Sequence, residues 1–249
     1  MAKRTADSHV AFFLSKLQPG MRVLDVGCGP GTVTLGLAEA VNPGEVIGAE
    51  LSLEQTKKVA KEAERKGLNL TFERADIYAL PYEADSFDAV FLSAVIGNLQ
   101  RPVDGMNEVY RVLTAGGVVG VKEFDHSANI NYPPTEFQTK VNELYNRLRI
   151  HNGHDPDSGR KVRSYLSMAG FVNVEAAATY QNTTPPPGVT GDPILESIVR
   201  DEWGPKFVEF GWASAKEIDD WVAQSEAHTT GDGDFSALAW IEAIGFKPA

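Results

Sequence analysis

The stretch Val23-Leu-Asp-Val-Gly-Cys-Gly-Pro-Gly31 decides the fold of this chain. The mainly apolar run Met21–Val26 predicts a buried parallel strand, and Thr32–Val41 has the pattern of a helix. Glycines between a strand and a helix permit a tight turn and let a ligand approach the backbone closely. The N-terminus of the helix also favours anionic groups. This segment therefore predicts a nucleotide-like ligand at a strand–turn–helix unit.

Strands and helices continue to alternate downstream. The apolar patterns predict strands over Glu45–Ala49, Leu70–Glu73, Phe87–Ser93 and Val118–Phe124, and helices over Leu53–Lys66 and Val103–Leu113. Before the glycine loop, the spacing of Val10, Phe13, Leu14 and Leu17 predicts one helix that follows a cap at Asp7 or Ser8. Such alternation is typical of a doubly wound, Rossmann-like α/β fold with helices on both faces of a mostly parallel sheet. Ligands of these folds bind at the carboxyl ends of the strands.

The second half of the chain has a looser pattern. It predicts a helix over Gly159–Ala169, a strand over Phe171–Ala178, an extended Thr183–Gly188 linker, helices within about 190–230 and a last strand over about 237–245. The expected sheet is thus seven-stranded. We expect a single domain, 1–249, with a cofactor-binding core over 1–125, substrate or lid insertions over 126–158 and 180–235, and a helical lid near the C-terminus.

Composition narrows the class of protein. The 249 residues carry a net charge of −11, which disfavours nucleic acid and anionic membranes as partners. Cys28 is the single cysteine, so no disulfide framework exists, as is typical of the cytoplasm. No apolar run approaches the roughly 20 residues needed to cross a bilayer. His151 and His154 lack an evident third ligand, and we expect no metal. The expectation is a cytoplasmic protein that is not associated with a membrane.

The spacing of the loop distinguishes between two nucleotide classes. A dinucleotide fingerprint has the pattern G-x-G-x-x-G, but here the third glycine comes one position early, at Gly31, and Thr32 stands in its place. Glu50 follows Gly29 by 21 residues at the end of the second strand, where a carboxylate can accept both ribose hydroxyls. An ordinary exposed glutamate at a strand end is the alternative reading.

These residues carry a family resemblance. The sequence resembles class I S-adenosylmethionine-dependent methyltransferases, in particular the small-molecule branch that includes the ubiquinone/menaquinone-biosynthesis type. Val23–Gly31 is similar to the first motif of that family, and Ala75–Pro81, Asp85–Val90 and Arg111–Gly117 resemble later ones in the correct order.

The resemblance implies S-adenosylmethionine as cofactor and S-adenosylhomocysteine as product. It implies that Asp76 accepts from the adenine amino group and that the backbone N–H of Ile77 donates to the ring. Ser93 would face the cofactor through its backbone, and Leu51 would lie against the ribose or adenine, although a core position is equally open to it. The other residues implied in the cofactor site are Asp25, Gly27, Cys28, Gly29, Gly31 and Glu50.

Catalytic residues are harder to assign. The cofactor itself activates the methyl group, and a base is needed only if the nucleophile starts protonated. Asp125 and His126, after the fifth strand, are weak candidates, and simple loop packing is the alternative for both. Where the family often has a histidine after the fourth strand, this chain has Ser93-Ala-Val-Ile-Gly-Asn98, so Asn98 is a third weak candidate.

Tryptophans and phenylalanines gather in the last part of the chain. Trp203, Trp212, Trp221 and Trp240 fall there, which is typical of packing and also of a lid over an apolar substrate. We therefore expect methyl transfer by in-line displacement to a small apolar or aromatic molecule. The acceptor atom and the oligomeric state are not readable from the sequence.

Three other functions are alternatives for a chain with this pattern. A nicotinamide-dependent dehydrogenase of the short-chain type would need Tyr-x-x-x-Lys, which this sequence lacks. A nucleic-acid methyltransferase is disfavoured by the acidic charge and by the absence of a Pro-Pro-aromatic element after Ser93. An S-adenosylmethionine-binding regulator without turnover stays open, because methyl transfer leaves no obligatory catalytic residue to find.

Overall fold

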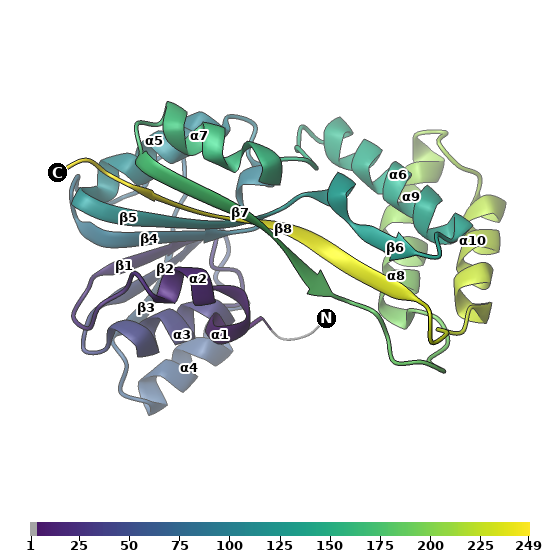
Figure 1. The fold of residues 1–249 in the computed structure, drawn as a ribbon, viewed down its shortest axis with the longest axis horizontal. Coiled ribbons are helices and arrows are strands. Elements are labelled where there is room, and N and C mark those ends of the chain that lie inside the picture. The colour runs from purple at the N-terminus through teal and green to yellow at the C-terminus, as the bar shows by residue number, and fades with distance from the viewer. Residues whose placement is uncertain (1–3) are drawn as a thin grey trace. The chain divides into compact units, whose positions relative to one another are not determined.

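The computed structural model describes residues 4–249 and divides the chain into two compact units. The first unit comprises the residues up to Phe124 together with Ser158–Thr179 and Trp240–Ala249, and the second comprises Asp125–Asp157 and Tyr180–Ala239. Figure 1 shows the elements of both units. Each unit is built around its own apolar core.

A mostly parallel sheet forms the centre of the first unit. Its strands are β1 (Val23–Val26), β2 (Val46–Glu50), β3 (Leu70–Arg74), β4 (Phe87–Ser93), β5 (Leu113–Phe124), β7 (Val172–Asn182) and β8 (Phe235–Phe246). The order is β3-β2-β1-β4-β5-β8, parallel from β3 to β5 and antiparallel between β5 and β8, and β7 pairs with β8. These strands confirm the predicted doubly wound, mostly parallel sheet. Its order places the ends of β1 and β4 side by side.

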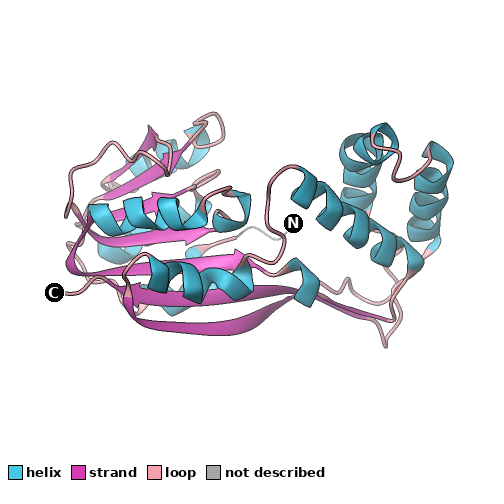
Figure 2. Ribbon diagram, turned by 90° about the horizontal axis from the view of Figure 1, so that it is seen from above, coloured by secondary structure: helices cyan, strands magenta, loops and turns pink. Residues whose placement is uncertain are grey.

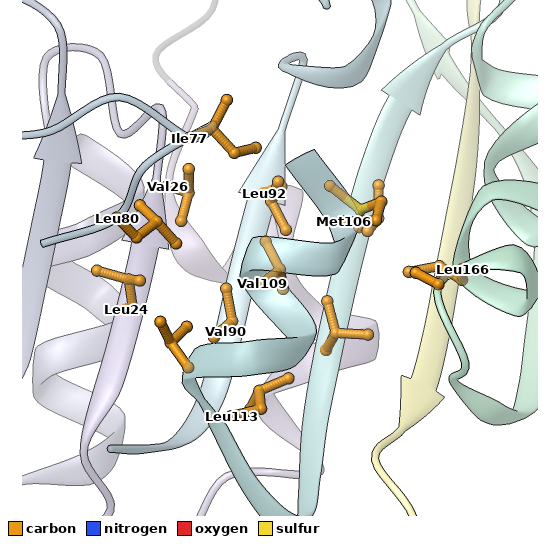
Figure 3. Close-up of a cluster of buried hydrophobic side chains, with 14 of the residues drawn as sticks. Leu24, Val26, Ile77, Leu80, Val90, Leu92, Met106, Val109, Leu113 and Leu166 are labelled. Carbon is orange, nitrogen blue, oxygen red and sulfur yellow. The ribbon is translucent and has the colours of Figure 1, made fainter. Parts of the chain in front are cut away.

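Helices cover both faces of this sheet. One face packs on α5 (Pro102–Val112) and α7 (Val162–Met168), and Figure 3 shows Leu24, Val90, Val109 and Leu166 among the side chains of this core. The other face packs on α1 (Ala6–His9), α2 (Ala11–Leu14) and α3 (Thr32–Val41). The helix α4 (Lys57–Arg65) follows β2. The short turn η1 (Ile96–Asn98) follows β4, and the short turn η3 (Gly159–Lys161) precedes α7.

The second unit is mainly helical (Figure 2). Its elements are η2 (His126–Ala128), β6 (Ile130–Tyr132), α6 (Glu136–His151), α8 (Pro193–Ile198), η4 (Val199–Trp203), α9 (Gly204–Glu209) and α10 (Ala215–Ala227). The apolar faces of α6 and α10 meet η4 and α9 around Val141, Phe207 and Trp221. The strand β6 pairs with residues 235–237, the part of β8 that belongs to the second unit, so a further strand joins the seven predicted.

Two sequence predictions about helices were wrong. In place of the single helix expected between a cap at Asp7 or Ser8 and Pro19-Gly20, the structure has two short helices, α1 and α2, that end at His9 and Leu14. The helix α1 begins after Thr5, whose side chain accepts a hydrogen bond from the Ser8 N–H. The cap at Asp7 or Ser8 was therefore misplaced. The helix α6 was not predicted, although Phe137, Val141, Leu144 and Leu148 lie at helical spacing behind a capping Thr135.

Candidate functional site

The glycine loop bends sharply between the end of β1 and the start of α3. Gly27, Gly29 and Gly31 have φ values of 70°, 53° and 80°, a region that side-chain-bearing residues rarely adopt. A Cβ on Gly27 would lie 2.5 Å from Val95, and one on Gly31 would lie 2.5 Å from Phe72. A Cβ on Gly29 would meet no atom within 4 Å. Packing therefore requires glycine at the two outer positions, and the middle one opens onto free space.

Glu50 lies beside this open side of the loop. It is the last residue of β2, and its Oε2 accepts a hydrogen bond of 2.9 Å from the N–H of Gly29 while Oε1 accepts one of 2.8 Å from that of Leu51. A pocket here is lined by Gly29, Glu50, Ser52 and Gln55. Each carboxylate oxygen can accept a second hydrogen bond, so the pair can receive two neighbouring hydroxyl groups.

Leu51 lies at the rim of the site and is 61% exposed. This exposure excludes the core role that the sequence left open for it. A large exposed apolar side chain beside a polar pocket suits the flat face of a sugar or base.

Asp25 and Cys28 lie beneath the loop. Asp25 is 2% exposed, and the hydroxyl of Thr34 donates a 2.7 Å hydrogen bond to its Oδ2. Burial raises the pKa of Asp25 to about 7, and the charge of Glu50 acts in the same direction. Burial also raises the pKa of the Cys28 thiol, so this side chain stays neutral. The bond to Thr34 ties the end of β1 to α3 beneath the glycine loop.

Asp76 and Ile77 follow β3 in a tight turn. The N–H of Tyr78 donates to Asp76 Oδ1 at 3.0 Å, and Asp76 forms an isolated bridge with Ala79. The side chain of Ile77 is buried in the core of the first unit. Asp76 itself is exposed, so its carboxylate is both a turn former and an accessible acceptor.

Ser93 and Asn98 flank the end of β4. The hydroxyl of Ser93 is hydrogen-bonded to His9 Nε2 at 2.8 Å. The Asn98 side-chain amide donates to the Ala94 carbonyl at 3.0 Å. Both side chains are thus engaged locally, and a role of Ser93 through its backbone remains compatible with this geometry.

Asp125 and His126 belong to the second unit. Asp125 is 2% exposed, and its N–H donates to the Ala239 carbonyl at 3.1 Å. The ring of His126 packs edge-on against Tyr145, with centroids 5.5 Å apart. Burial, followed by the positive charge of Arg149, lowers the pKa of His126 to about 4. His126 is therefore neutral at pH 7.

Sequence reasoning missed several residues of the site. Ser52 and Gln55 line the pocket, and their position within five residues after Glu50 was an available signal. His9 is hydrogen-bonded to Ser93, which lies 84 residues later in the chain. No local sequence pattern indicates such a contact. In residues 4–249, no group of three or more His, Cys, Asp or Glu side chains could hold a metal ion. None of the helices described is long and apolar enough to span a membrane.

Comparison with known proteins decides the family. A model of the methyltransferase domain matches residues 17–170, which is more than half of the chain. The chain belongs to the methyltransferase family. An uncharacterized methyltransferase of Schizosaccharomyces pombe is 36% identical over 188 residues, 72% of this chain and 67% of that protein.

Other relatives agree with this family. The ubiquinone/menaquinone biosynthesis C-methyltransferase of a Ruegeria species is 36% identical over 177 residues, 66% of this methyltransferase and 68% of that one. Some relatives are longer: the match spans only 48% of a protein in transposon TN4556 of Streptomyces fradiae, which is 37% identical over 175 residues.

Solved structures share the fold. The YcgJ protein of a Bacillus species superposes with a TM-score of 0.62 at 21% identity, covering 96% of this methyltransferase and 98% of that chain. A phosphoethanolamine N-methyltransferase of Haemonchus contortus in complex with S-adenosyl-L-methionine superposes with a TM-score of 0.56 at 17% identity. The superposition covers 93% of this methyltransferase and 50% of that chain.

The chain is an enzyme of the methyltransferase family, and we propose that its cofactor is S-adenosylmethionine. Its own residues fit this group. The open space at Gly29 admits a close ligand, the Glu50 carboxylate can accept vicinal hydroxyls, and Leu51 offers an apolar surface. We assign the predicted cofactor residues to these roles as a proposal, together with Asp76 and Ile77 for the adenine.

Proposed function

We propose that this methyltransferase transfers the methyl group to a small apolar or aromatic molecule by in-line displacement. The observation that carries the proposal is a stacked aromatic pair in the second unit. The rings of Tyr145 and Trp203 stack with centroids 4.2 Å apart, and His126 packs edge-on against the same tyrosine. All three side chains are only half-buried. Accessible aromatic faces suit a planar or apolar ligand.

Further features support a small acceptor. The net charge of −11 opposes binding to nucleic acid, and a relative carries a name from ubiquinone/menaquinone biosynthesis. We further propose that the segments 126–158 and 180–235 serve acceptor recognition within a single functional domain. The low cysteine content supports a cytoplasmic location.

The mechanism requires positioning above all. When bound, the cofactor supplies a methyl group that is already activated for transfer. Glu50 and the Gly27–Gly31 loop hold and orient the donor, and the aromatic pair orients the acceptor. Alignment of two reactants and exclusion of water yield a large rate gain by themselves.

Proton transfer constrains the choice of acceptor. With a pKa of about 4, His126 is a weak base at pH 7. Asn98 is not a base, and the buried Asp125 is held in the second unit near the strand β8. We therefore expect an acceptor atom that reacts without a general base at neutral pH, which agrees with the absence of an obligatory catalytic residue in this chemistry.

A screen tests this function. Wild-type enzyme is incubated with S-adenosylmethionine and matched aromatic and aliphatic small molecules, and S-adenosylhomocysteine formation is measured. We expect turnover with aromatic members, and a raised KM after Trp203→Ala. Trp212→Ala is the matched control, because Trp212 packs on Phe210 and Arg147 and away from Tyr145. Turnover restricted to aliphatic molecules, or equal effects of both substitutions, would contradict the proposal.

A further inference from the structure

The turn that follows β4 holds its backbone in an uncommon conformation. Ala94, its first residue, has a φ of 57°, which is rare for a residue with a side chain. The N–H of Ala94 donates to the Lys122 carbonyl at 2.9 Å, and the Asn98 side-chain amide donates to the Ala94 carbonyl at 3.0 Å. A conformation of this kind persists where the surrounding structure fixes it, and such residues cluster at functional sites.

Two buried N–H groups begin the helical turn η1 that comes next. They belong to Ile96 and Gly97, which are both buried. The first N–H groups of a helical turn have no acceptor within the turn itself, so another group must supply one. Here the Oε2 atom of Glu123 accepts both hydrogen bonds, at 2.7 Å from the Ile96 nitrogen and 3.3 Å from the Gly97 nitrogen.

Glu123 reaches this turn from the neighbouring strand β5. Its side chain belongs to a residue that is only 3% exposed, and its Oε1 atom accepts a further hydrogen bond of 3.0 Å from the N–H of Phe124. A buried carboxylate is costly unless such hydrogen bonds compensate for the lost water. Because 27 residues separate Glu123 from Ile96, this carboxylate is a tertiary contact that fixes the turn to β5.

Val95 connects the turn to the glycine loop. It directly precedes Ile96, is half-buried and packs against the apolar core of the first unit. Its Cγ2 atom lies so close to Gly27 that a Cβ added there would be 2.5 Å away. Val95 therefore rests against the first glycine of the loop, which has a φ of 70°. Since closely packed interiors transmit displacements, a shift of Val95 would loosen the loop.

We propose that Glu123 is a positioning residue for the cofactor: it fixes the turn after β4 so that Val95 holds the glycine loop in its binding conformation. The carboxylate acts through the N–H groups of Ile96 and Gly97 rather than by contact with the ligand. The proposed role of Glu123 rests on the cofactor site assigned above. It adds to that site a residue of β5, which carries none of the cofactor residues that the sequence motifs imply.

Two other roles of Glu123 compete with this one. The carboxylate could contribute to folding stability alone, in which case any substitution that destabilises the sheet would have the same effect on binding. Its negative charge could also act on the ligand directly, in which case the charge would matter and the length of the side chain would not. Substitutions that change length and charge separately distinguish the three roles.

Glu123→Asp tests the reach of the carboxylate, because it keeps the negative charge and removes one methylene, which withdraws the oxygens from Ile96. Glu123→Gln keeps the length and removes the charge. We expect calorimetry to show that binding of S-adenosylhomocysteine weakens roughly tenfold in Glu123→Asp and less than about threefold in Glu123→Gln. Asp88→Asn is the matched control and should bind like wild type. The Asp88 carboxylate also accepts a backbone N–H, that of Arg22 at 2.8 Å, but at the amino end of β4.

A double-mutant cycle with Val95→Ala tests the route. Once Val95 has been shortened, Glu123→Asp should weaken binding of S-adenosylhomocysteine by less than about twofold, because the contact through which it acts is already lost. Hydrogen exchange measured by mass spectrometry gives a second readout. The amides of residues 94–98 should exchange faster in Glu123→Asp than in wild type and unchanged in Asp88→Asn, whereas a loss of global stability alone would speed exchange throughout the first unit.

Four results would overturn the positioning role: unchanged binding in Glu123→Asp, an equal loss in Asp88→Asn, a larger loss in Glu123→Gln than in Glu123→Asp, or additive effects of Glu123→Asp and Val95→Ala. If Glu123→Asp does not fold, Val95→Ala alone decides, since a loss of binding is required of it and unchanged binding would overturn the role. Wild-type protein that does not bind S-adenosylhomocysteine would contradict the cofactor assignment itself, and the role of Glu123 with it.

Discussion

The N–H of Gly29 donates a 2.9 Å hydrogen bond to Glu50 Oε2, although 21 residues separate the two in sequence. This bond joins the glycine loop to the end of the neighbouring strand, so the two sequence signals form one structural unit. It also holds the carboxylate in place before a ligand arrives. Preorganisation of this kind reduces the entropy lost on binding.

Gly29→Ala tests whether the space above the loop receives the cofactor. The added Cβ meets no protein atom within 4 Å, so only the positive φ of 53° opposes it, at a cost of about 1–2 kcal/mol in folding stability. The same Cβ would occupy the ligand's space, and we expect binding of S-adenosylhomocysteine to weaken roughly tenfold or more, ~1.4 kcal/mol. Urea unfolding and calorimetry measure the two effects.

Gly67→Ala is the control for this substitution. Gly67 has a φ of 65° and equally open surroundings, but it lies after α4 and away from the loop. A similar loss of stability with unchanged binding is expected. If Gly29→Ala bound the ligand as tightly as Gly67→Ala does, the open space would not be the cofactor site.

Asp25 gives the folding stability a specific pH dependence. Because burial raises its pKa to about 7, the folded state keeps the proton between the unfolded pKa near 4 and pH 7, whereas the unfolded state releases it. The free energy of unfolding should therefore fall as the pH rises through this window and level off above it. Between pH 5 and 8 the contribution of Asp25 is on the order of 2–3 kcal/mol.

Asp25→Asn removes this contribution. Urea unfolding of wild type and variant at pH 5 and pH 8 measures it, and we expect the variant to gain stability relative to wild type as the pH rises. A stability difference that is the same at both pH values would show that Asp25 titrates normally. The exposed Asp7→Asn serves as control and should give no such change.

Gly120→Ala tests the packing of the segment before β1. A Cβ here would lie 2.3 Å from the ring of Phe13, which is fully buried. Overpacking of a buried site costs typically about 1–3 kcal/mol, so thermal unfolding should begin at a lower temperature. Gly233→Ala, where a Cβ meets no neighbour, should leave the transition unchanged. Equal transitions for both variants would mean that Phe13 does not pack against β5.

The region from β1 to β5 was predictable because its signals are local. The run Thr32–Val41 coincides with α3, and Phe87–Ser93 coincides with β4, since buried parallel strands and amphipathic helices have distinct apolar periods. The glycine loop directly joins β1 to α3, and Glu50 is the last residue of β2, so each signal is adjacent to the element that positions it. Short separations of this kind are visible in a single sequence.

The remaining features depend on tertiary contacts. The bond between His9 and Ser93 spans 84 residues. The guanidinium of Arg4 lies over the rings of Phe124 and Trp240, which come much later in the chain. The single helix expected before the glycine loop is interrupted at Val10, between α1 and α2. Conversely, α6 was not predicted although its apolar spacing is readable in the sequence.

Calorimetric titration with S-adenosylhomocysteine tests the central claim, that the Gly27–Gly31 loop and Glu50 bind the cofactor. We predict one binding site in the wild-type protein, and for Glu50→Ala a loss of about 1.5–3 kcal/mol, or roughly 10- to 100-fold in affinity. Glu64→Ala, an exposed glutamate on α4, should bind like wild type. Wild-type protein that does not bind S-adenosylhomocysteine, or a Glu50→Ala variant that binds it as tightly as Glu64→Ala does, would contradict the account.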